Sequence, residues 1–555
     1  MTLRGLTHNV ASYLPHMAAN HGDTVAVYFP VGKGGNGQIK YESCTYHALN
    51  EESDLLAKGL AEMGVSRGTR VVLMVKPSLD FFTLVFAIFK VGATMVCVDP
   101  GMGAENLGVC LGQAKPEVFI GIAKAHAARK ILGWAKKTIR QNVMVGESVF
   151  FRKIKNLSEV KSLGTKSKYE IDYQTDSDQV PAILFTSGST GIPKGVIYSH
   201  QNFMAQVTAL RDTYGITPGE VDLATFPLFA LYAPVLGMTA VIPQMDFTKP
   251  GRVKPENILE PIKQFGVNNL FGSPALLNCV GQVVQSQQIK LPSLKRVLSA
   301  GAPVPARVMR LFENSLKPGV FIHTPYGATE SLPVASASSR EVLGNTEIAT
   351  ANGEGVCVGH VVGQAEVKII QITDAPICKW DQSLELPRGE IGEIIVQGPC
   401  VTAGYDQMPE QTKLAKIENE KSFYHRMGDL GYFDQQGRLW FCGRKSQRVI
   451  TAKKVYYSVA CEGVFNAHAA VFRSALVKLS RKQKIMPGIC LELSRKVSKY
   501  ERKKIVKEIR IIAAENPITQ GIDHVFFHAS FPVDIRHNAK INREMLSRWA
   551  QRKLR

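Results

Sequence analysis

The first 150 residues of the chain alternate short apolar runs with helical spacing. Residues 70–75, 94–98 and 118–120 have the composition of buried strands, and residues 46–63 repeat apolar side chains at the helical period. This alternation predicts an α/β layer around a largely parallel sheet.

A strongly apolar stretch over residues 81–98 has almost the length of a membrane span. Lys90 and Gly92 interrupt it, and it divides into a helix over residues 79–90 and a strand over residues 93–98. Neither piece has the roughly 20 apolar residues that a spanning helix needs. We therefore expect both pieces to be buried inside the protein.

Strand-like runs continue through the middle of the chain, at residues 180–185, 221–226, 269–271, 296–298 and 320–323. Residues 153–179 are polar and charge-dense, which predicts a connector. Residues 389–396 predict the start of a β subdomain, and residues 439–442 predict a last strand before Gly443 and Arg444.

Positive charge gathers in the last fifth of the chain. The net charge is +20, and residues 446–555 hold 23 Lys and Arg against 8 Asp and Glu. This shift predicts an α/β protein with a large domain over residues 1–445, made of layered α/β subdomains plus a β subdomain, and a small basic domain after it. Much of the surplus lies over residues 495–510, where Ile505 and Ile509 keep helical spacing. An anionic substrate, a partner protein or peripheral association with a membrane surface would explain it, but a solvated helix face is the interpretation we favour.

The composition argues against several other classes of protein. The apolar share of 45% and the charged share of 21% are typical of soluble globular proteins. Ten cysteines occur without a CxxC pair, so we expect neither a zinc site nor a disulfide framework. The N-terminal 11 residues lack a long apolar core, and we expect no signal peptide and a cytoplasmic location. No aromatic-interleaved basic segment or zinc-finger pattern supports nucleic-acid binding.

Residues 186–195, with the sequence TSGSTGIPKG, place hydroxyls, glycines and a lysine directly after a predicted strand. Glycine lets the backbone approach an anion, and successive N–H groups in such a turn form an anion-binding nest. A polyphosphate is the ligand that this loop suits best, although the Walker pattern is absent and a Gly/Ser surface loop is the alternative. The predicted nucleotide-binding residues are Thr186, Ser187, Gly188, Ser189, Thr190, Gly191 and Lys194.

Two further motifs, at residues 299–304 and 326–330, each follow a predicted strand. Open α/β sheets bind ligands at this edge. Tyr326 offers a flat ring for a base, Thr329 a hydroxyl for a phosphate, and Glu330 an oxygen ligand for Mg²⁺. Further nucleotide contacts are predicted from Gly301, Ala302, Pro303 and Gly327.

Together these motifs resemble those of the adenylate-forming superfamily, which includes acyl-CoA ligases, luciferases and peptide-synthetase adenylation domains. In addition to the stretches at residues 186–195 and 326–330, matching signatures occur at residues 425–431 (HRMGDLG), 443–444 (GR) and 538–541 (NAKI). The resemblance implies a small, mobile α+β C-terminal lid. It also implies that a carboxylic acid reacts with ATP, with Mg²⁺ present, to give an acyl-AMP and pyrophosphate.

The resemblance assigns roles to single residues. Asp429 would accept hydrogen bonds from both ribose hydroxyls, for which a carboxylate offers two acceptor oxygens. Arg444 would lie near the ribose or a phosphate. Lys540 would bridge the carboxylate and the α-phosphate as negative charge builds up. Together with Thr329 and Glu330, Lys540 is therefore a predicted catalytic residue.

Three positions differ from the pattern of the thioester-forming members. Ala230 follows Phe229 where many acyl-CoA ligases have histidine, and Ser446 stands where the hinge usually has Asp or Lys. Lys453 stands where CoA-using members have glycine, and a side chain there would crowd a pantetheine tunnel. These differences argue against a thiol as the second nucleophile.

Several strings instead resemble the β-lactone synthetases of olefin biosynthesis: residues 226–232 (FPLFALY), 237–243 (GMTAVIP), 425–429 (HRMGD), 442–446 (CGRKS) and 533–540 (VDIRHNAK). This resemblance implies that a 2-alkyl-3-hydroxy fatty acid is adenylated and that its own 3-hydroxyl attacks the activated carbonyl. A β-lactone and AMP then leave without CoA. The resemblance also suggests other enzymes of a hydrocarbon pathway as partners.

Two alternatives stay open. A long-chain acyl-CoA or fatty acyl-AMP ligase would pass the acyl group to a thiol, and a non-enzymatic homologue would only bind nucleotide within a multienzyme complex. The acyl pocket is predicted from residues that fit an ordinary core equally well, namely Phe229, Leu231, Tyr232, Pro234 and Met238.

Overall fold

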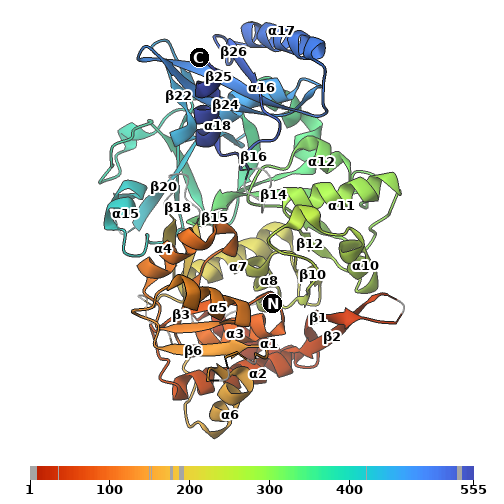
Figure 1. Cartoon of the computed structure of the whole chain (residues 1–555), viewed down its shortest axis with the longest axis vertical. Coiled ribbons are helices and arrows are strands. Elements are labelled where there is room, and N and C mark those ends of the chain that lie inside the picture. Colours follow the sequence, from red (N-terminus) through yellow and green to blue (C-terminus); the bar gives the residue numbers. More distant parts are fainter. Residues whose placement is uncertain are drawn as a thin grey trace.

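The computed structural model describes residues 9–35, 37–148, 150–151, 153–174, 179–186, 193–420, 422–533 and 540–554. Figure 1 shows an elongated molecule, with the blue C-terminal elements at the top and the red and orange elements of the first part of the chain, among them α2 and α6, at the bottom. The chain has the predicted α/β fold, built around two large sheets and two small ones.

The first large sheet has seven strands in the order β7-β6-β5-β3-β4-β8-β9. All neighbours are parallel except β8 and β9, which confirms the predicted, largely parallel sheet. The strands are β3 (Arg70–Met74), β4 (Thr94–Cys97), β5 (Val118–Ile122), β6 (Gln141–Val145), β7 (Lys155–Asn156), β8 (Ala182–Thr186) and β9 (Lys194–Tyr198). The helix predicted over residues 79–90 is α3 (Leu79–Lys90), and its residues 81–90 are all buried.

The connector predicted over residues 153–179 is wrong in part, because it contains helix α6 (Leu157–Lys166), which begins with a capping box. This helix packs against α2 (Tyr46–Glu62). A Cβ atom on Gly164 would lie 2.0 Å from a backbone oxygen of α2, so the two backbones approach as only glycine permits. The contact that stabilises α6 is therefore a tertiary one.

The second large sheet has 14 strands, in the order β17-β18-β20-β21-β16-β15-β14-β13-β12-β10-β11-β1-β2, with β19 beside β20. It is parallel from β1 through β11, β10, β12 and β13 to β14, and antiparallel from β14 onward to β17. The start of the β subdomain was predicted at residues 389–396, but β16 and β17 precede that segment and continue the same sheet.

The strands of this sheet are β1 (Val25–Lys33), β2 (Ile39–Thr45), β10 (Val221–Leu223), β11 (Thr239–Val241), β12 (Asn269–Phe271), β13 (Arg296–Leu298), β14 (Ile322–Ala328), β15 (Ser331–Ser338), β16 (Val356–Val361), β17 (Glu366–Ile370), β18 (Gly392–Gln397), β19 (Lys416–Asn419), β20 (Ser422–Phe433) and β21 (Leu439–Arg444). One apolar core joins the two large sheets, since it contains Val71 and Ile120 of the first and Ala26 and Ala240 of the second.

Helices cover both sheets (Figure 1). In addition to those named above they are α1 (Tyr13–His21), α4 (Ala104–Ala114), α5 (Ala123–Leu132), α7 (His200–Tyr214), α8 (Pro227–Ala230), α9 (Tyr232–Val235), α10 (Glu256–Gln264), α11 (Pro274–Ser286), α12 (Ala306–Arg310), α13 (Ser339–Glu341), α14 (Glu347–Ala351) and α15 (Pro409–Ala415). Among the described residues, no helix combines the length and the apolar character that crossing a membrane requires.

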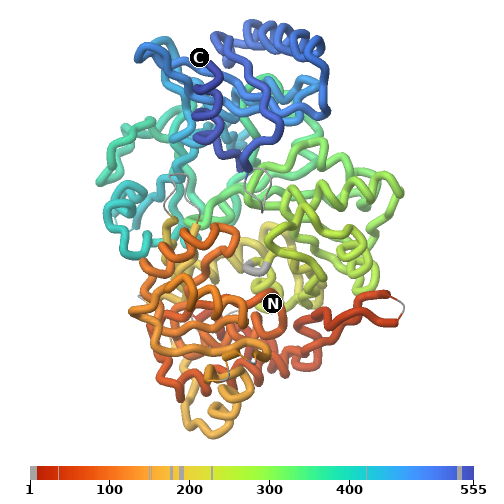
Figure 2. The backbone as a smooth tube through the Cα atoms, viewed as in Figure 1, coloured from red at the N-terminus to blue at the C-terminus, as the bar shows by residue number. Residues whose placement is uncertain are grey.

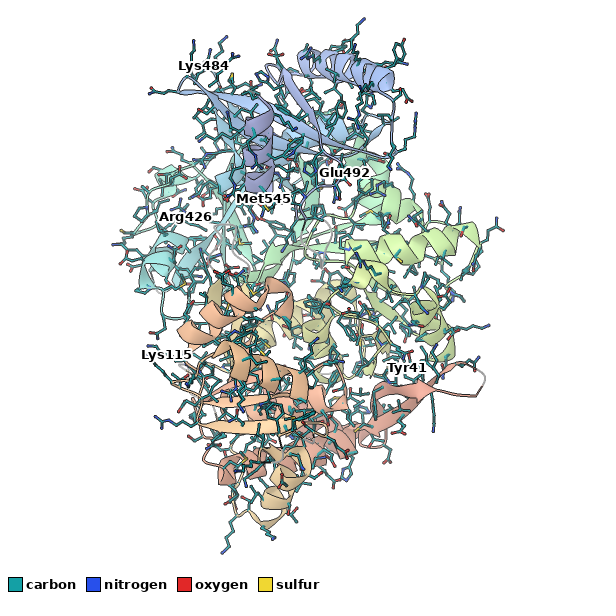
Figure 3. All side chains as sticks on the ribbon, in the orientation of Figure 1. Tyr41, Lys115, Arg426, Lys484, Glu492 and Met545 are labelled. Carbon is teal, nitrogen blue, oxygen red and sulfur yellow. The ribbon has the colours of Figure 1, made fainter. Side chains whose placement is uncertain are left out.

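After β21 the chain leaves the large sheet and forms a C-terminal unit with an apolar core of its own. Its elements are β22 (Val449–Ile450), β23 (Val455–Tyr456), α16 (Ser458–Asn466), β24 (Val471–Arg481), β25 (Lys484–Leu493), α17 (Lys499–Glu515), β26 (His524–Phe527) and α18 (Arg543–Lys553). Figure 2 shows this unit, in blue, stacked on the strands of the large sheet. Lys484 lies at its outer end and Met545 toward the cleft described below (Figure 3). In α17 the predicted apolar positions Ile505 and Ile509 are both buried.

Candidate active site

A cleft of about 3440 Å³ is lined by both large sheets and by the C-terminal unit. The predicted nucleotide and catalytic residues on its wall are Thr186, Lys194, Gly301, Ala302, Pro303, Tyr326, Gly327, Thr329, Glu330, Asp429, Arg444 and Lys540. The predicted loop residues Ser187, Gly188, Ser189, Thr190 and Gly191 lie outside the described residues. Motifs that are hundreds of residues apart in the sequence thus meet at one place.

The two ends of the predicted phosphate loop are held by a hairpin. Thr186 and Lys194 are paired across antiparallel β8 and β9, so the loop begins at the carboxyl end of a strand that runs parallel to β4. Lys194 Nζ lies 4.8 Å from the centre of the Tyr405 ring. Burial lowers the pKa of Lys194, and the Glu330 carboxylate opposes this effect. An anion bound here would therefore stabilise the charged form of the lysine further.

Tyr326 and Gly327 lie within a strand, not after it as predicted, because β14 extends to Ala328. Thr329 and Glu330 form the turn into β15. A Cβ atom on Gly327 would lie 2.5 Å from a backbone oxygen of β15, so glycine is needed for this hairpin to close.

Neighbouring side chains fix the turn at the tip of this hairpin. Tyr198 Oη donates to the Thr329 carbonyl at 2.6 Å, and the backbone N–H and Oγ1 of Thr402 donate to the Glu330 carbonyl at 2.9 and 3.1 Å. Tyr405 Oη donates to Glu330 Oε1 at 2.8 Å. The Glu330 carboxylate is thereby held on the cleft wall with its second oxygen available as a ligand.

Asp429 lies at the centre of the nucleotide side of the cleft. Tyr326 Oη donates to Asp429 Oδ2 at 2.7 Å, and Arg444 Nε lies 3.1 Å from Oδ1. Burial raises the pKa of Asp429, whereas Arg444 and the Tyr326 hydrogen bond lower it. Oδ1 is buried and accepts no well-aligned hydrogen bond from the described residues. A buried carboxylate oxygen with this spare capacity fits a ribose hydroxyl.

Lys540 reaches the cleft from the C-terminal unit. A bridge between Val533 and Ile541 holds the backbone next to it. Lys540 lines the same cleft as Asp429, and its charge lowers the pKa of that carboxyl group.

The sequence pattern did not single out Lys416, a half-buried lysine whose charge acts on Glu330 and His425. It is paired with His425 across β19 and β20, and its Nζ donates to the Thr402 carbonyl. Burial lowers the pKa of Lys416 to about 7, and Glu330 opposes this effect. Burial also lowers the pKa of His425 well below its usual range, and the charge of Lys416 adds to this. In the sequence Lys416 stands between two apolar residues, Ala415 at the end of α15 and Ile417 in β19, which are both buried.

The apolar end of the cleft contains three of the predicted acyl-pocket residues. Phe229, Leu231 and Tyr232 line it, and the Phe229 ring stacks on Phe271 with 4.2 Å between ring centres. Met238 does not line the cleft; it is buried in the core that joins the two sheets. Its predicted contact with substrate stays a prediction.

Of the three positions that depart from thioester-forming enzymes, Ala230 is buried in the core and Ser446 lines the cleft. Lys453 is exposed in the turn between β22 and β23 and does not line the cleft. In this orientation of the C-terminal unit the Lys453 side chain therefore does not lie on the path of a pantetheine thiol. It would obstruct that path only in a different orientation of the unit.

Comparison with known proteins agrees with this geometry. The AMP-binding enzyme family matches residues 10–406, and the chain belongs to that family. It is 45% identical to the olefin beta-lactone synthetase of Stenotrophomonas maltophilia (strain K279a) over 98% of each chain. It is also 44% identical to the olefin beta-lactone synthetase of Xanthomonas campestris pv. campestris, over 98% of this chain and 97% of the relative. The amide bond synthetase McbA from Marinactinospora thermotolerans has the same fold, with a TM-score of 0.78 at 20% identity, over 97% of this chain and 99% of that one.

Proposed function

We propose that the protein is an ATP-dependent β-lactone synthetase that acts on a long-chain 2-alkyl-3-hydroxy acid. The observation that carries this proposal is the likeness over almost the full length to olefin beta-lactone synthetases, joined to a cleft in which the adenylation residues meet. A distant likeness to acyl-CoA ligases, at 24–27% identity, fits the ligase alternative less well.

In this mechanism the nucleotide side of the cleft activates the acid. Asp429 holds the ribose hydroxyls, Lys194 and the loop that it closes hold phosphates, and Lys540 stabilises the charge that develops as the carboxylate attacks the α-phosphorus. Pyrophosphate leaves and the acyl-AMP remains. The 3-hydroxyl oxygen then forms a bond to C1 as the bond from C1 to the phosphate oxygen breaks. Because both groups belong to one molecule, orientation supplies up to about 7–11 kcal/mol in well-aligned systems.

The first prediction separates this activity from that of an acyl-CoA ligase. Without CoA, a 2-alkyl-3-hydroxy acid and ATP are expected to give AMP, pyrophosphate and a lactone, identified by mass analysis. The matched acid that lacks the 3-hydroxyl should stop at bound acyl-AMP, because no nucleophile reaches its carbonyl. If the deoxy acid gives a CoA thioester as fast as the hydroxy acid turns over, the protein is an acyl-CoA ligase.

Mg²⁺ is the proposed metal, and Glu330 the side chain that would hold it together with phosphate oxygens. The carboxylate fits this role because it lines the cleft and Tyr405 donates to only one of its oxygens. When bound, Mg²⁺ would neutralise phosphate charge. The described residues contain no group of three or more His, Cys, Asp or Glu that could hold a metal ion by themselves.

The second prediction tests this role. Glu330→Gln should raise the Mg²⁺ concentration needed for half-maximal pyrophosphate release about tenfold, because a neutral amide is a poorer ligand than a carboxylate. Glu385→Gln, on a carboxylate paired with Lys368 away from the cleft, is the control and should leave the titration unchanged. An unaltered titration in Glu330→Gln would remove this residue from the metal site.

The division of labour between the two parts of the chain is also a proposal. We infer that residues 446–555 act as a lid that brings Lys540 to the cleft, with the joint at Ser446 after the last strand of the large sheet. Because Ile505 and Ile509 of α17 are buried in the core of this unit, its basic residues face outward. Association with a membrane or with other enzymes of a hydrocarbon pathway stays a prediction.

A further inference from the structure

A chain of three polar side chains crosses the apolar end of the cleft. Tyr198 at the end of β9, Gln206 on α7 and Tyr232 on α9 all line the cleft. Tyr232 Oη donates to Gln206 Oε1, Gln206 Nε2 donates to Tyr198 Oη at 3.4 Å, and Tyr198 Oη donates to the Thr329 carbonyl at 2.6 Å. The chain connects the acyl side of the cleft to the hairpin that carries Glu330.

The direction of each hydrogen bond in this chain follows from its last acceptor. A backbone carbonyl only accepts, so the Tyr198 hydroxyl must donate to Thr329. Tyr198 Oη then accepts from the Gln206 amide nitrogen, and this turns the Gln206 oxygen toward Tyr232. The Tyr232 hydrogen is therefore committed to Gln206, and the Tyr232 oxygen keeps the capacity to accept a hydrogen bond from a group in the cleft that this residue lines.

These polar groups stand among apolar neighbours. The same part of the cleft is lined by Phe203, Leu210, Phe226, Phe229 and Val235. Gln206 is only 4% exposed. Burying an amide and hydroxyls costs free energy unless they are hydrogen-bonded, and an alkyl chain cannot form hydrogen bonds with them. A hydroxyl group on the substrate can.

We propose that Tyr232, oriented by Gln206 and Tyr198, is the subsite that recognises the 3-hydroxyl of the acid. This proposal rests on the proposed function, and it identifies the 3-hydroxyl as the part of the substrate that the subsite binds. Tyr232 Oη accepts the hydroxyl hydrogen and aims the hydroxyl oxygen at C1. During ring closure that oxygen bonds to C1, the bond from C1 to the AMP phosphate breaks, and the proton passes to the departing phosphate oxygen.

Burial raises the pKa of Tyr232 well above its ordinary value, so the phenol stays protonated and acts as an acceptor, not as a base. Tyr232 and Gln206 thus position the hydroxyl, and no proton needs to be stored on either of them.

The test compares two acids in the first half of the reaction, before any lactone forms. Pyrophosphate release is followed in a single turnover, with enzyme in excess over the 2-alkyl-3-hydroxy acid or over the matched deoxy acid, and the ratio of the two apparent second-order rate constants gives the preference for the hydroxyl. Tyr232→Phe keeps the ring and removes the acceptor, so this preference should fall about tenfold, the net worth of one hydrogen bond to a neutral group. Activity with the deoxy acid, which has no hydroxyl for the subsite to bind, should fall much less than activity with the hydroxy acid. Gln206→Met, which frees the Tyr232 hydroxyl to rotate, should lower the preference in the same direction.

Tyr46→Phe is the matched control. Tyr46 is a fully buried tyrosine near the same pocket, and its hydroxyl donates to the Met238 carbonyl at 2.8 Å without lining the cleft. The Tyr46→Phe substitution should lower the thermal stability of the protein and leave the preference for the 3-hydroxy acid unchanged. An unchanged preference in Tyr232→Phe, or an equal loss for both acids, would overturn the subsite. The subsite is tested by pyrophosphate release and the proposed function by lactone formation. The two proposals can therefore be contradicted separately, because either measurement can give the expected result when the other does not.

Discussion

Lys540→Ala is expected to reduce acyl-AMP formation by about 10²-fold or more, which is the scale for removing one preorganised charge from a developing anion. Lys540 lines the cleft from the C-terminal unit, and its charge lowers the pKa of Asp429; in the proposed mechanism it stabilises the charge that develops as the carboxylate attacks the α-phosphate. The loss should appear in kcat of pyrophosphate release. Binding of ATP should change little, because Asp429 and Lys194 remain.

A matched control comes from the same unit. Lys484→Ala removes an equal charge from an exposed position at the outer end of the C-terminal unit (Figure 3) and should leave pyrophosphate release unaltered. Both variants remove one positive charge, but from different places in the C-terminal unit. A loss of pyrophosphate release in Lys540→Ala alone would therefore show that the position of the charge matters, and not the net charge of the unit. Wild-type pyrophosphate release in Lys540→Ala would exclude this residue from the mechanism.

Asp429→Asn is expected to raise the KM for ATP by about 10²-fold. The carboxylate offers acceptors to two ribose hydroxyls, and hydrogen bonds to charged groups contribute about 1.5–3 kcal/mol each. An amide of the same size keeps one acceptor and turns a donor toward Arg444, which loses its ion-pair partner at 3.1 Å. Calorimetry with a non-hydrolysable ATP analogue measures the affinity directly, and thermal unfolding shows whether the variant remains folded.

Two comparisons make the Asp429 result specific. Tyr326→Phe removes the hydroxyl that donates to Asp429 Oδ2 but keeps the carboxylate, so its effect on the KM for ATP should be smaller. Asp434→Asn changes a carboxylate just beyond the same strand, where it binds Arg438 and Trp440 outside the cleft, and should leave ATP binding unchanged. Equal effects of Asp429→Asn and Asp434→Asn would mean that the loss comes from the strand and not from the nucleotide site.

These two variants also divide the reaction. In the proposed mechanism Lys540 acts on charge that exists only in the transition state, so its loss is expected to lower kcat. Asp429 is proposed to bind ribose before and during the reaction, so its loss is expected to raise KM. Acyl activation and ring closure then have separate signatures, since the preference for a 3-hydroxy acid depends on Tyr232 at the other end of the cleft.

The sequence by itself determined those helices and strands that depend on interactions between residues near one another in the chain. The helix of residues 79–90 and the strands of the parallel sheet follow from apolar runs, and Ile505 and Ile509 mark the buried face of α17 because helical periodicity needs no distant partner. The order of the motifs was enough to indicate the family.

Tertiary structure alone decided which of these residues meet and what surrounds them. Tyr326 and Asp429 are 103 residues apart and Tyr405 and Glu330 are 75 apart, so their hydrogen bonds depend on how the sheet brings its strands together. Helix α6 lies in a segment that reads as a polar connector, because its partner helix supplies the contact through Gly164. The surroundings of Lys416 and the oriented chain from Tyr232 to the Thr329 carbonyl are likewise products of packing. The free energy of a buried polar group is set by neighbours that local pattern does not reveal.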